Sequence, residues 1–259
     1  MQSKWTGLSV ILLLVFVVAV PLIASSQGAN LWMWFTPAIT PAGEAIGTLF
    51  NWVLLLCGVL FVGIHAIMIY FAIAYRAGNR DETAHTHGHL GIEVTWTIIP
   101  TIIMIVFGIY SYNVYANIVE TPKDPMTVKV TAQQFAWNVK YPSTDKSSED
   151  PISMNNQMVL PSNRSIQIQL QSKDVLHSFY VPHFRNKQDA VPGMTTVLNI
   201  QKIQETGKYD IKCAELCGVG HYRMNASLAV VSPDEFETWK EKKRNDKGKQ
   251  YLKKVMSDE

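Results

Sequence analysis

The sequence predicts an α + all-β fold in which a membrane-embedded helical half precedes a water-soluble β-domain. The first observation is the charge distribution: of the 44 charged residues, seven lie before residue 120 and 37 lie from residue 120 onward. So few charges cannot cover the surface of a soluble domain, in which about a quarter of all residues are charged. Two long apolar runs and a later series of short alternating segments are the other two observations. The net charge of +2 gives no reason to expect a nucleic-acid partner.

The chain begins with an apolar run at residues 8–24, which is shorter than the about 20 residues that a spanning helix needs. Small residues follow this run, so the sequence predicts a cleaved signal peptide over residues 1–26. A retained N-terminal membrane helix is the alternative. Pro37 and Pro41 then argue against a helix through residues 31–43.

Two transmembrane helices are predicted next. Residues 46–75 contain no Lys, Arg, Asp or Glu, and residues 94–116 form a second apolar run, in which Pro100 should kink the helix. The polar connection at residues 76–92 carries two arginines, so the positive-inside rule places it in the cytoplasm. Residues 120–259 must therefore lie on the outer face of the membrane.

From residue 126 the pattern changes to short segments with period-two alternation, separated by Pro, Gly, Asn and Ser. Such segments predict a β-sandwich or barrel. The polar stretch at residues 143–156 is predicted to be a mobile loop, and residues 233–255 are predicted to form a helix. The expected strands are residues 126–131, 135–141, 164–171, 196–201, 208–212 and 226–231. The expected parts of the chain are a signal peptide (1–26), an N-terminal segment with the membrane hairpin (27–119), a β-domain (120–232) and a helical tail (233–259).

A cluster of metal-binding residue types lies near the end of the β-domain. Cys213 and Cys217 are followed by His221 and Met224, and His177 lies upstream. Thiolate, imidazole and thioether groups form a soft ligand set that selects copper or zinc over calcium or magnesium, and a Met ligand favours copper. Two bridging thiolates would hold two copper ions. A disulfide on the oxidising outer face, a structural zinc site and a pair of inert thiols are the alternatives.

Four motifs connect this pattern to a known family. They are I-E-V-T-W-T-I-I-P at 92–100, D-V-L-H-S-F-Y-V-P at 174–182, K-Q-D-A-V-P-G at 187–193 and C-A-E-L-C-G-V-G-H-Y-R-M at 213–224. In their order and spacing the sequence resembles subunit II of the haem–copper cytochrome c oxidases, from about residue 45 onward. The resemblance implies a two-helix transmembrane hairpin followed by a cupredoxin-like Greek-key β-barrel that carries a dinuclear copper A centre.

The resemblance also implies a role for each ligand. Cys213 and Cys217 would be bridging thiolates, His177 and His221 would each bind one copper, and Met224 would be a weak ligand to one of them. The main-chain carbonyl of Glu215 would be a weak ligand to the other copper. The Glu215 carboxylate would help to bind a magnesium ion shared with subunit I, with an ordinary surface carboxylate as the alternative.

The resemblance also implies roles for residues that are not metal ligands. Glu93 matches a glutamate at the mouth of a proton pathway into subunit I, although a capping acid at the helix start is the alternative. Phe135 and Trp137 lie in A-Q-Q-F-A-W at 132–137, where the family usually has G-x-Q-W-x-W. The first tryptophan, taken as the point where electrons enter, is therefore matched by Phe135, and Trp137 remains.

The function implied by this resemblance is electron transfer in a respiratory terminal oxidase. Electrons from cytochrome c would reach the copper centre and pass to the haem of subunit I, where oxygen is reduced and protons are pumped. Asp174 and Asp189 would face a basic donor, with solvated surface as the alternative. The chain has no C-x-x-C-H motif, so the donor is a separate protein.

Three other protein classes share part of this pattern. A membrane-anchored copper chaperone for oxidase assembly also pairs C-x3-C with a distant His, but it places the cysteines early in the chain. A quinol oxidase relative lacks the copper ligands, and a reductase with the same copper centre needs no membrane hairpin. The expected location is a bacterial cytoplasmic (or inner) membrane, with two spans and the β-domain on the periplasmic side.

Overall fold

The computed structural model describes residues 36–76, 88–142 and 152–255, and it describes side chains only as far as residue 246. The predicted signal peptide at residues 1–26 lies outside these ranges. The chain divides into two compact units: most of the membrane helices form one, and residues 37–47 together with 111–259 form the other. Each unit is described by itself.

The two predicted membrane helices are confirmed. They are α2, Pro41–Ala74, and α3, Leu90–Val119, and both are long and apolar enough to cross a membrane. Pro41 is the first residue of α2, because a proline at the first helical position sacrifices no hydrogen bond. The Thr40 hydroxyl caps this helix by accepting a hydrogen bond from the Gly43 N–H at 3.0 Å. The prediction of a non-helical segment is therefore wrong for residues 41–43.

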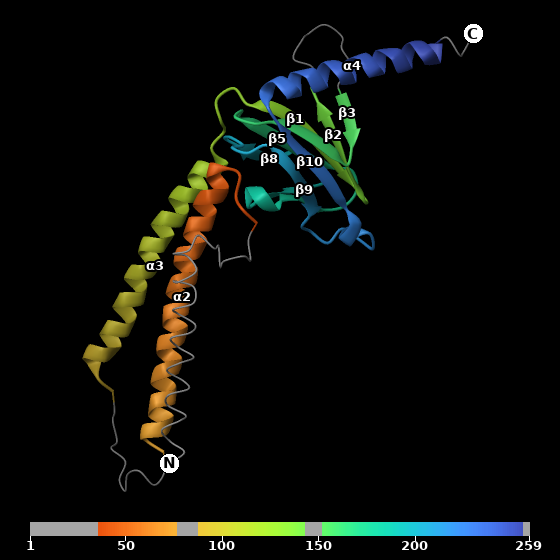
Figure 1. Ribbon diagram of the computed structural model, residues 1–259. Coiled ribbons are helices and arrows are strands. Elements are labelled where there is room, and N and C mark those ends of the chain that lie inside the picture. The colour runs from red at the N-terminus through yellow and green to blue at the C-terminus, as the bar shows by residue number, and fades with distance from the viewer. Residues whose placement is uncertain (1–35, 77–87, 143–151, 256–259) are drawn as a thin grey trace, which may run out of the picture. The chain divides into compact units, whose positions relative to one another are not determined.

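The β-unit consists of two five-stranded sheets (Figure 1). The first sheet has the order β3-β2-β1-β5-β8, and the second has the order β4-β10-β9-β6-β7. β1 pairs in parallel with β5, and β10 pairs in parallel with β4. The bounds are β1 Met126–Gln133, β2 Ala136–Tyr141, β3 Ile152–Asn155, β4 Gln157–Pro161, β5 Ile166–Ser172, β6 His177–Val181, β7 Asn186–Ala190, β8 Thr196–Ile200, β9 Gly207–Cys213 and β10 Asn225–Val231.

Six of these strands match the predicted segments to within a few residues, and four were not predicted. The expected loop at 143–156 is wrong at its end, because Ile152–Asn155 forms β3, whereas residues 143–151 lie outside the described part of the chain. β6 was missed because it is buried on both faces and so shows no alternation. β7 was missed because its sequence, N-K-Q-D-A, is mostly polar and lies at a sheet edge.

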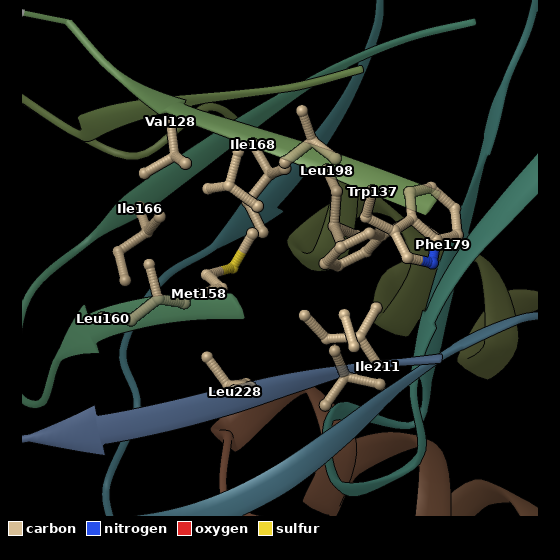
Figure 2. Close-up of a cluster of buried hydrophobic side chains, with 14 of the residues drawn as sticks. Val128, Trp137, Met158, Leu160, Ile166, Ile168, Phe179, Leu198, Ile211 and Leu228 are labelled. Atoms are coloured by element: carbon tan, nitrogen blue, oxygen red, sulfur yellow. The ribbon is translucent and has the colours of Figure 1, made fainter. Parts of the chain in front are cut away.

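The core fills the space between the two sheets, as Figure 2 shows. Val128 and Ile168 from the first sheet face Leu160 and Leu228 from the second, and all four side chains are at most 1% exposed. Trp137 lies among them and packs edge-on against Phe179, with ring centroids 5.5 Å apart. Burying such a cluster stabilises the sandwich, since each large apolar side chain contributes about 1.5–3 kcal/mol.

The segment before the first helix is part of this core. Ile39 is 1% exposed, its N–H donates to the His183 carbonyl, and its own carbonyl accepts from the Gln204 N–H. At the end of the hairpin, the Asn199 amide donates to the Val119 carbonyl at 3.0 Å. The compact β-unit therefore includes chain on both sides of the membrane helices, although the sequence suggested a domain that starts at residue 120.

The end of the sandwich at which β2 and β10 finish is closed by the start of α4, Pro233–Val255 (Figure 1). Ser232 and Glu235 form a capping box at its start: the Glu235 carboxylate accepts from the Ser232 N–H, and the Glu235 N–H donates to the Ser232 hydroxyl. Phe236 and Trp239 stack on each other and pack against Tyr141 at the end of β2.

Candidate metal centre

The ligand loop, residues 213–224, connects β9 to β10. These strands are antiparallel neighbours, and the Cys213 N–H extends their ladder by donating to the Met224 carbonyl at 3.2 Å. Both ends of the loop are therefore fixed by the sheet. A turn of 3-10 helix at His221–Arg223 folds the loop back on itself, with the His221 N–H donating to the Gly218 carbonyl. Backbone hydrogen bonds thus hold the loop at both ends and in its middle.

The side chains of this loop converge on one point. The sulfur atoms of Cys213 and Cys217 are 3.8 Å apart, and the Cys217 sulfur lies 3.6 Å from His221 Nδ1 and 3.7 Å from the Met224 sulfur. The Glu215 carbonyl oxygen is 3.2 Å from the Cys213 sulfur. The structure therefore brings together the five loop groups that the sequence singled out.

His177 reaches the same cluster from the neighbouring strand. β6 pairs with β9, with Phe179 opposite Cys213, so the first residue of β6 lies beside the end of β9. His177 Nδ1 is 3.9 Å from the Cys213 sulfur, and the ligand atoms of His177, Cys213 and Cys217 all lie within 4.8 Å of one another. Three thiol or imidazole groups at this spacing can bind one or two soft metal ions.

Burial makes the Cys217 thiol a poor anion unless a cation is present. Cys217 is 3% exposed and Met224 is fully buried. Burial, with Cys213 beside it, raises the pKa of the Cys217 thiol to about 11. All three cysteines of the chain are free in the structure, so the disulfide alternative is not the state seen here. The donor set is rich in sulfur and its inner members, His177, Cys217 and Met224, are buried, so it fits copper or zinc.

Asp174 orients the imidazole of His177. Its carboxylate lies 2.8 Å from His177 Nε2, so Nε2 carries the proton and Nδ1 presents its lone pair to the cluster. Partial burial opposes ionisation of Asp174, but hydrogen bonds from the Gln134 N–H and from His177 lower its pKa to about 2. Sequence reasoning placed Asp174 on a docking surface and missed this positioning role, which its place three residues before His177 could have signalled.

The turn between β1 and β2 covers the ligand loop. The Gln134 side-chain amide donates to the Cys217 carbonyl at 2.6 Å, and the Phe135 ring lies against the loop backbone. A Cβ added to Gly220 would stand 2.5 Å from Phe135 Cδ2, so a larger residue at position 220 would displace the ring. Sequence reasoning missed the contribution of Gln134 and of Gly220, because neither is a metal-ligating residue type.

The remaining residues that the sequence singled out are Trp137, Glu93, Asp189 and Glu215, and they differ in burial and in their neighbours. Trp137 is fully buried, with its ring centroid 6.1 Å from that of His177, so no partner protein can touch it. Glu215 is partly exposed in the ligand loop, and Asp189 lies in β7 opposite Ser178. Glu93 lies in the first turn of α3, where its carboxylate accepts a hydrogen bond from the His89 N–H at 3.1 Å. The family roles of these residues stay predictions.

Comparisons with known proteins agree with this arrangement. Residues 136–231 match the model of the cytochrome c oxidase subunit II periplasmic domain, and residues 26–114 match the model of the transmembrane domain of the same subunit. Cytochrome c oxidase subunit 2 of Cereibacter sphaeroides is 27% identical, over 81% of this chain and 80% of its own. Alternative cytochrome c oxidase subunit 2 of Bradyrhizobium diazoefficiens is 29% identical, over 82% of this chain and 84% of its own.

Among solved structures, the chain is similar to the periplasmic domain of subunit II of cytochrome oxidase from Bradyrhizobium japonicum. The two are 30% identical, the match covers 49% of this chain and 99% of that domain, and the TM-score is 0.44.

The fold and the site define a class: a membrane protein in which a two-helix hairpin carries a cupredoxin-like β-domain with a cluster of soft metal ligands. Within that class, the chain belongs to the cytochrome c oxidase subunit II family, since the two models of that subunit together match residues 26–114 and 136–231. It is accordingly a cytochrome c oxidase subunit.

Proposed function

We propose that this chain is the electron-accepting subunit of its oxidase. A dinuclear copper A centre, held by the β-domain, would take electrons from cytochrome c and pass them to the haem of subunit I for oxygen reduction coupled to proton pumping. One observation carries the proposal: two thiols, two imidazoles, a thioether and a carbonyl converge at 3.2–3.9 Å between neighbouring donor atoms. Such a set is larger and softer than a single zinc ion needs.

The family resemblance assigns the residues that would hold the copper ions, and the convergence of their donor atoms supports that assignment. Cys213 and Cys217 would bridge the two ions, and His177 and His221 would bind one each. Met224 and the Glu215 carbonyl would complete the two sites as weak ligands. When bound, the pair of copper ions supplies a redox centre that gains or loses one electron shared between two metals.

The protein's own contribution is to keep the positions of the ligand atoms unchanged when the copper centre would gain or lose an electron. The ladder bond between Cys213 and Met224 fixes the loop ends, and the Gln134 amide ties the Cys217 carbonyl to the β1–β2 turn. The Asp174 carboxylate holds the His177 ring in one orientation and one tautomer. The buried Met224 and Trp137 exclude water from the inner side of the site. These supports favour rapid electron transfer because little has to move.

The finer roles belong to the same proposal. Phe135, which packs on the ligand loop, would be where electrons enter, with the buried Trp137 behind it beside His177. The Glu215 carboxylate would bind magnesium shared with subunit I, and Glu93 would lie at the mouth of a proton pathway. The expectation that Asp174 and Asp189 help to dock a basic donor stays a prediction. The β-domain would face the periplasm of a bacterial cell, with residues 1–26 removed as a signal peptide.

The test is copper reconstitution of the full-length chain in detergent. A soluble piece that starts at residue 120 would lack the buried Ile39, so the full chain is the better sample. We expect two copper ions per chain and a spectrum of one electron delocalised over both. Cys217→Ser should abolish that spectrum. Cys57→Ser, which changes an exposed cysteine of α2, should preserve it. One metal ion per chain, or a preference for zinc, would overturn the proposal.

A further inference from the structure

We propose that the electron donor docks on an apolar surface that carries a cation, so the docking face of the donor is apolar and edged by carboxylates rather than rich in lysine. This inference rests on the proposed function and names the chemistry of the partner. The surface, called here the docking cap, consists of Phe135, Val175, Leu176, Val219, Tyr222 and Arg223.

The docking cap is apolar and lies directly over the metal ligands. Val219 is 95% exposed and Tyr222 is 78% exposed, although both belong to the ligand loop. Val175 and Leu176, which immediately precede His177, are 38% exposed each. Exposed apolar side chains gathered in one place mark interaction sites. An electron donor gains most from contact here because the ligands lie just beneath.

The cap is continuous across three segments of the chain. The Phe135 ring contacts the backbone at Gly218 and Gly220, on either side of Val219. The Gln134 N–H donates to the Asp174 carboxylate at 2.6 Å, which joins the β1–β2 turn to the segment that carries Val175. The three segments therefore form one surface around the half-buried Phe135 rather than separate exposed residues.

The charged group that packs on Phe135 is a cation. The Arg223 guanidinium carbon lies 5.9 Å from the centre of the Phe135 ring, and the Arg223 side chain is exposed. A second cation is Lys173, whose ammonium lies 3.3 Å from the side-chain oxygen of Gln133, the last residue of β1. A lysine-rich donor would bring like charges together at this point, and like charges across an interface slow association.

The nearby acid, Asp174, is turned inward. Its carboxylate accepts hydrogen bonds from the N–H groups of Gln134 and Val175 and from His177. Both oxygen atoms of this carboxylate therefore already accept hydrogen bonds within the chain, which makes Asp174 a weaker partner for a lysine than a free surface carboxylate. Asp174 is bonded to the metal-site histidine, whereas the Arg223 and Lys173 side chains are exposed. Docking of a basic cytochrome through Asp174 and Asp189 is the competing expectation, and one experiment separates the two.

The experiment measures donor oxidation by the purified, assembled oxidase. Two soluble c-type cytochromes serve as probes, one lysine-rich and one acidic, and the second-order rate of reduction of the copper site is followed as salt is raised. We expect the acidic probe to be the faster one at low salt and to slow as salt is added. Arg223→Glu should slow the acidic probe roughly fivefold and speed the lysine-rich one.

Two further variants keep the result interpretable. Lys208→Glu changes a cation at the start of β9, at the opposite end of the strand from Cys213, and should leave both rates unchanged. Val219→Ser should slow both probes equally at all salt concentrations, because it removes apolar contact and no charge. The copper spectrum of each variant is recorded first. A wild-type oxidase without a dinuclear copper spectrum contradicts the proposed function itself.

Three outcomes would overturn the docking proposal while leaving the proposed function intact. The first is a lysine-rich probe that is faster at low salt and is slowed by added salt. The second is Arg223→Glu with unchanged rates for both probes. The third is Val219→Ser oxidase from which subunit I is lost on purification, since the cap would then be a contact between subunits.

Discussion

The two ends of the β-unit are built on different principles. At the end closed by α4, Tyr141, Phe236 and Trp239 pack ring against ring, with centroids 5.2–6.3 Å apart. At the other end, His177 and Cys217 are equally buried but are surrounded by hydrogen-bonding groups and sulfur atoms. Ring packing dominates the first end, supplemented by the hydrogen bonds of the Tyr141 hydroxyl with the Val159 backbone and by the capping box of Ser232 and Glu235. The second end is held by hydrogen bonds, and its donor atoms lie close enough together to bind a metal ion.

The largest contrast should come from removing one aromatic side chain at each end. Trp137→Ala and Phe236→Ala each delete a side chain that is at most 1% exposed, and each should cost about 3–5 kcal/mol of folding free energy. Only Trp137→Ala should also alter the metal spectrum, because Trp137 packs edge-on against His177. Two measurements check this. Denaturant unfolding of the metal-free chain gives the folding free energy, and the metal spectrum is recorded on the folded chain after copper has been added. Equal damage to the spectrum from Phe236→Ala would mean that the two ends are not independent.

Asp174 tests whether hydrogen bonding organises the metal end. Asp174→Ala removes the acceptor for His177 Nε2 and should weaken metal binding about 10- to 100-fold. Asp174→Asn keeps one acceptor oxygen and should lose less. Asp210→Asn, which alters an exposed carboxylate on the outer side of β9, serves as the control in a metal titration. If Asp174→Ala binds metal as tightly as Asp210→Asn does, the imidazole needs no such support.

Gly220 tests how closely the β1–β2 turn must cover the ligand loop. Gly220→Ala places a methyl group 2.5 Å from Phe135 Cδ2, so the ring has to move, at a cost of about 1–3 kcal/mol. The copper spectrum should survive, while electron uptake from the donor slows. Combining Gly220→Ala with Phe135→Ala should remove the stability cost, and unfolding measurements on the four proteins of this cycle check it. Additive losses in the double variant would show that the two residues do not compete for space.

The smallest effect is expected at the cap of α4. Ser232→Ala should cost about 1 kcal/mol, because it removes a hydroxyl that accepts from the Glu235 N–H. Hydrogen bonds from the Ser232 N–H and hydroxyl lower the pKa of Glu235 below its usual 4.5. The stability that this carboxylate contributes is therefore present above pH 4.5 and is lost as the pH falls through the lower folded-state pKa. Unfolding measured against pH should show a weaker decline over this window in Ser232→Ala, with the metal spectrum unchanged.

The ligand set was predictable because most of it is local. Five of its six residues lie within one loop, and residue type alone marks Cys213, Cys217 and His221 as candidate metal ligands. The support for these ligands was not predictable, because it depends on which strands lie side by side. Nothing in the sequence pairs Gln134 with Cys217, and their contact exists only because the β1–β2 turn closes over the ligand loop.

The prediction of strands from the sequence was limited in a similar way, because only alternating segments could be recognised. Strands with one buried face, such as Met126–Gln133 and Asn225–Val231, alternate in sequence and were predicted. His177–Val181 is buried on both faces and Asn186–Ala190 is polar at a sheet edge, so neither alternates. Ile39 gave no signal at all, since an isolated isoleucine before a membrane helix does not reveal which core it joins.

The position of Ile39 has a consequence for the order of biogenesis. Its backbone bonds with His183 and Gln204, and these residues are synthesised only after both membrane helices have been made. The core is therefore complete only when Ile39, which precedes the hairpin in the sequence, lies on the same side of the membrane as the β-domain. Completion of the core therefore reports that the two helices have been inserted with both outer ends on the same side. A hairpin inserted with the wrong topology would leave the domain without Ile39.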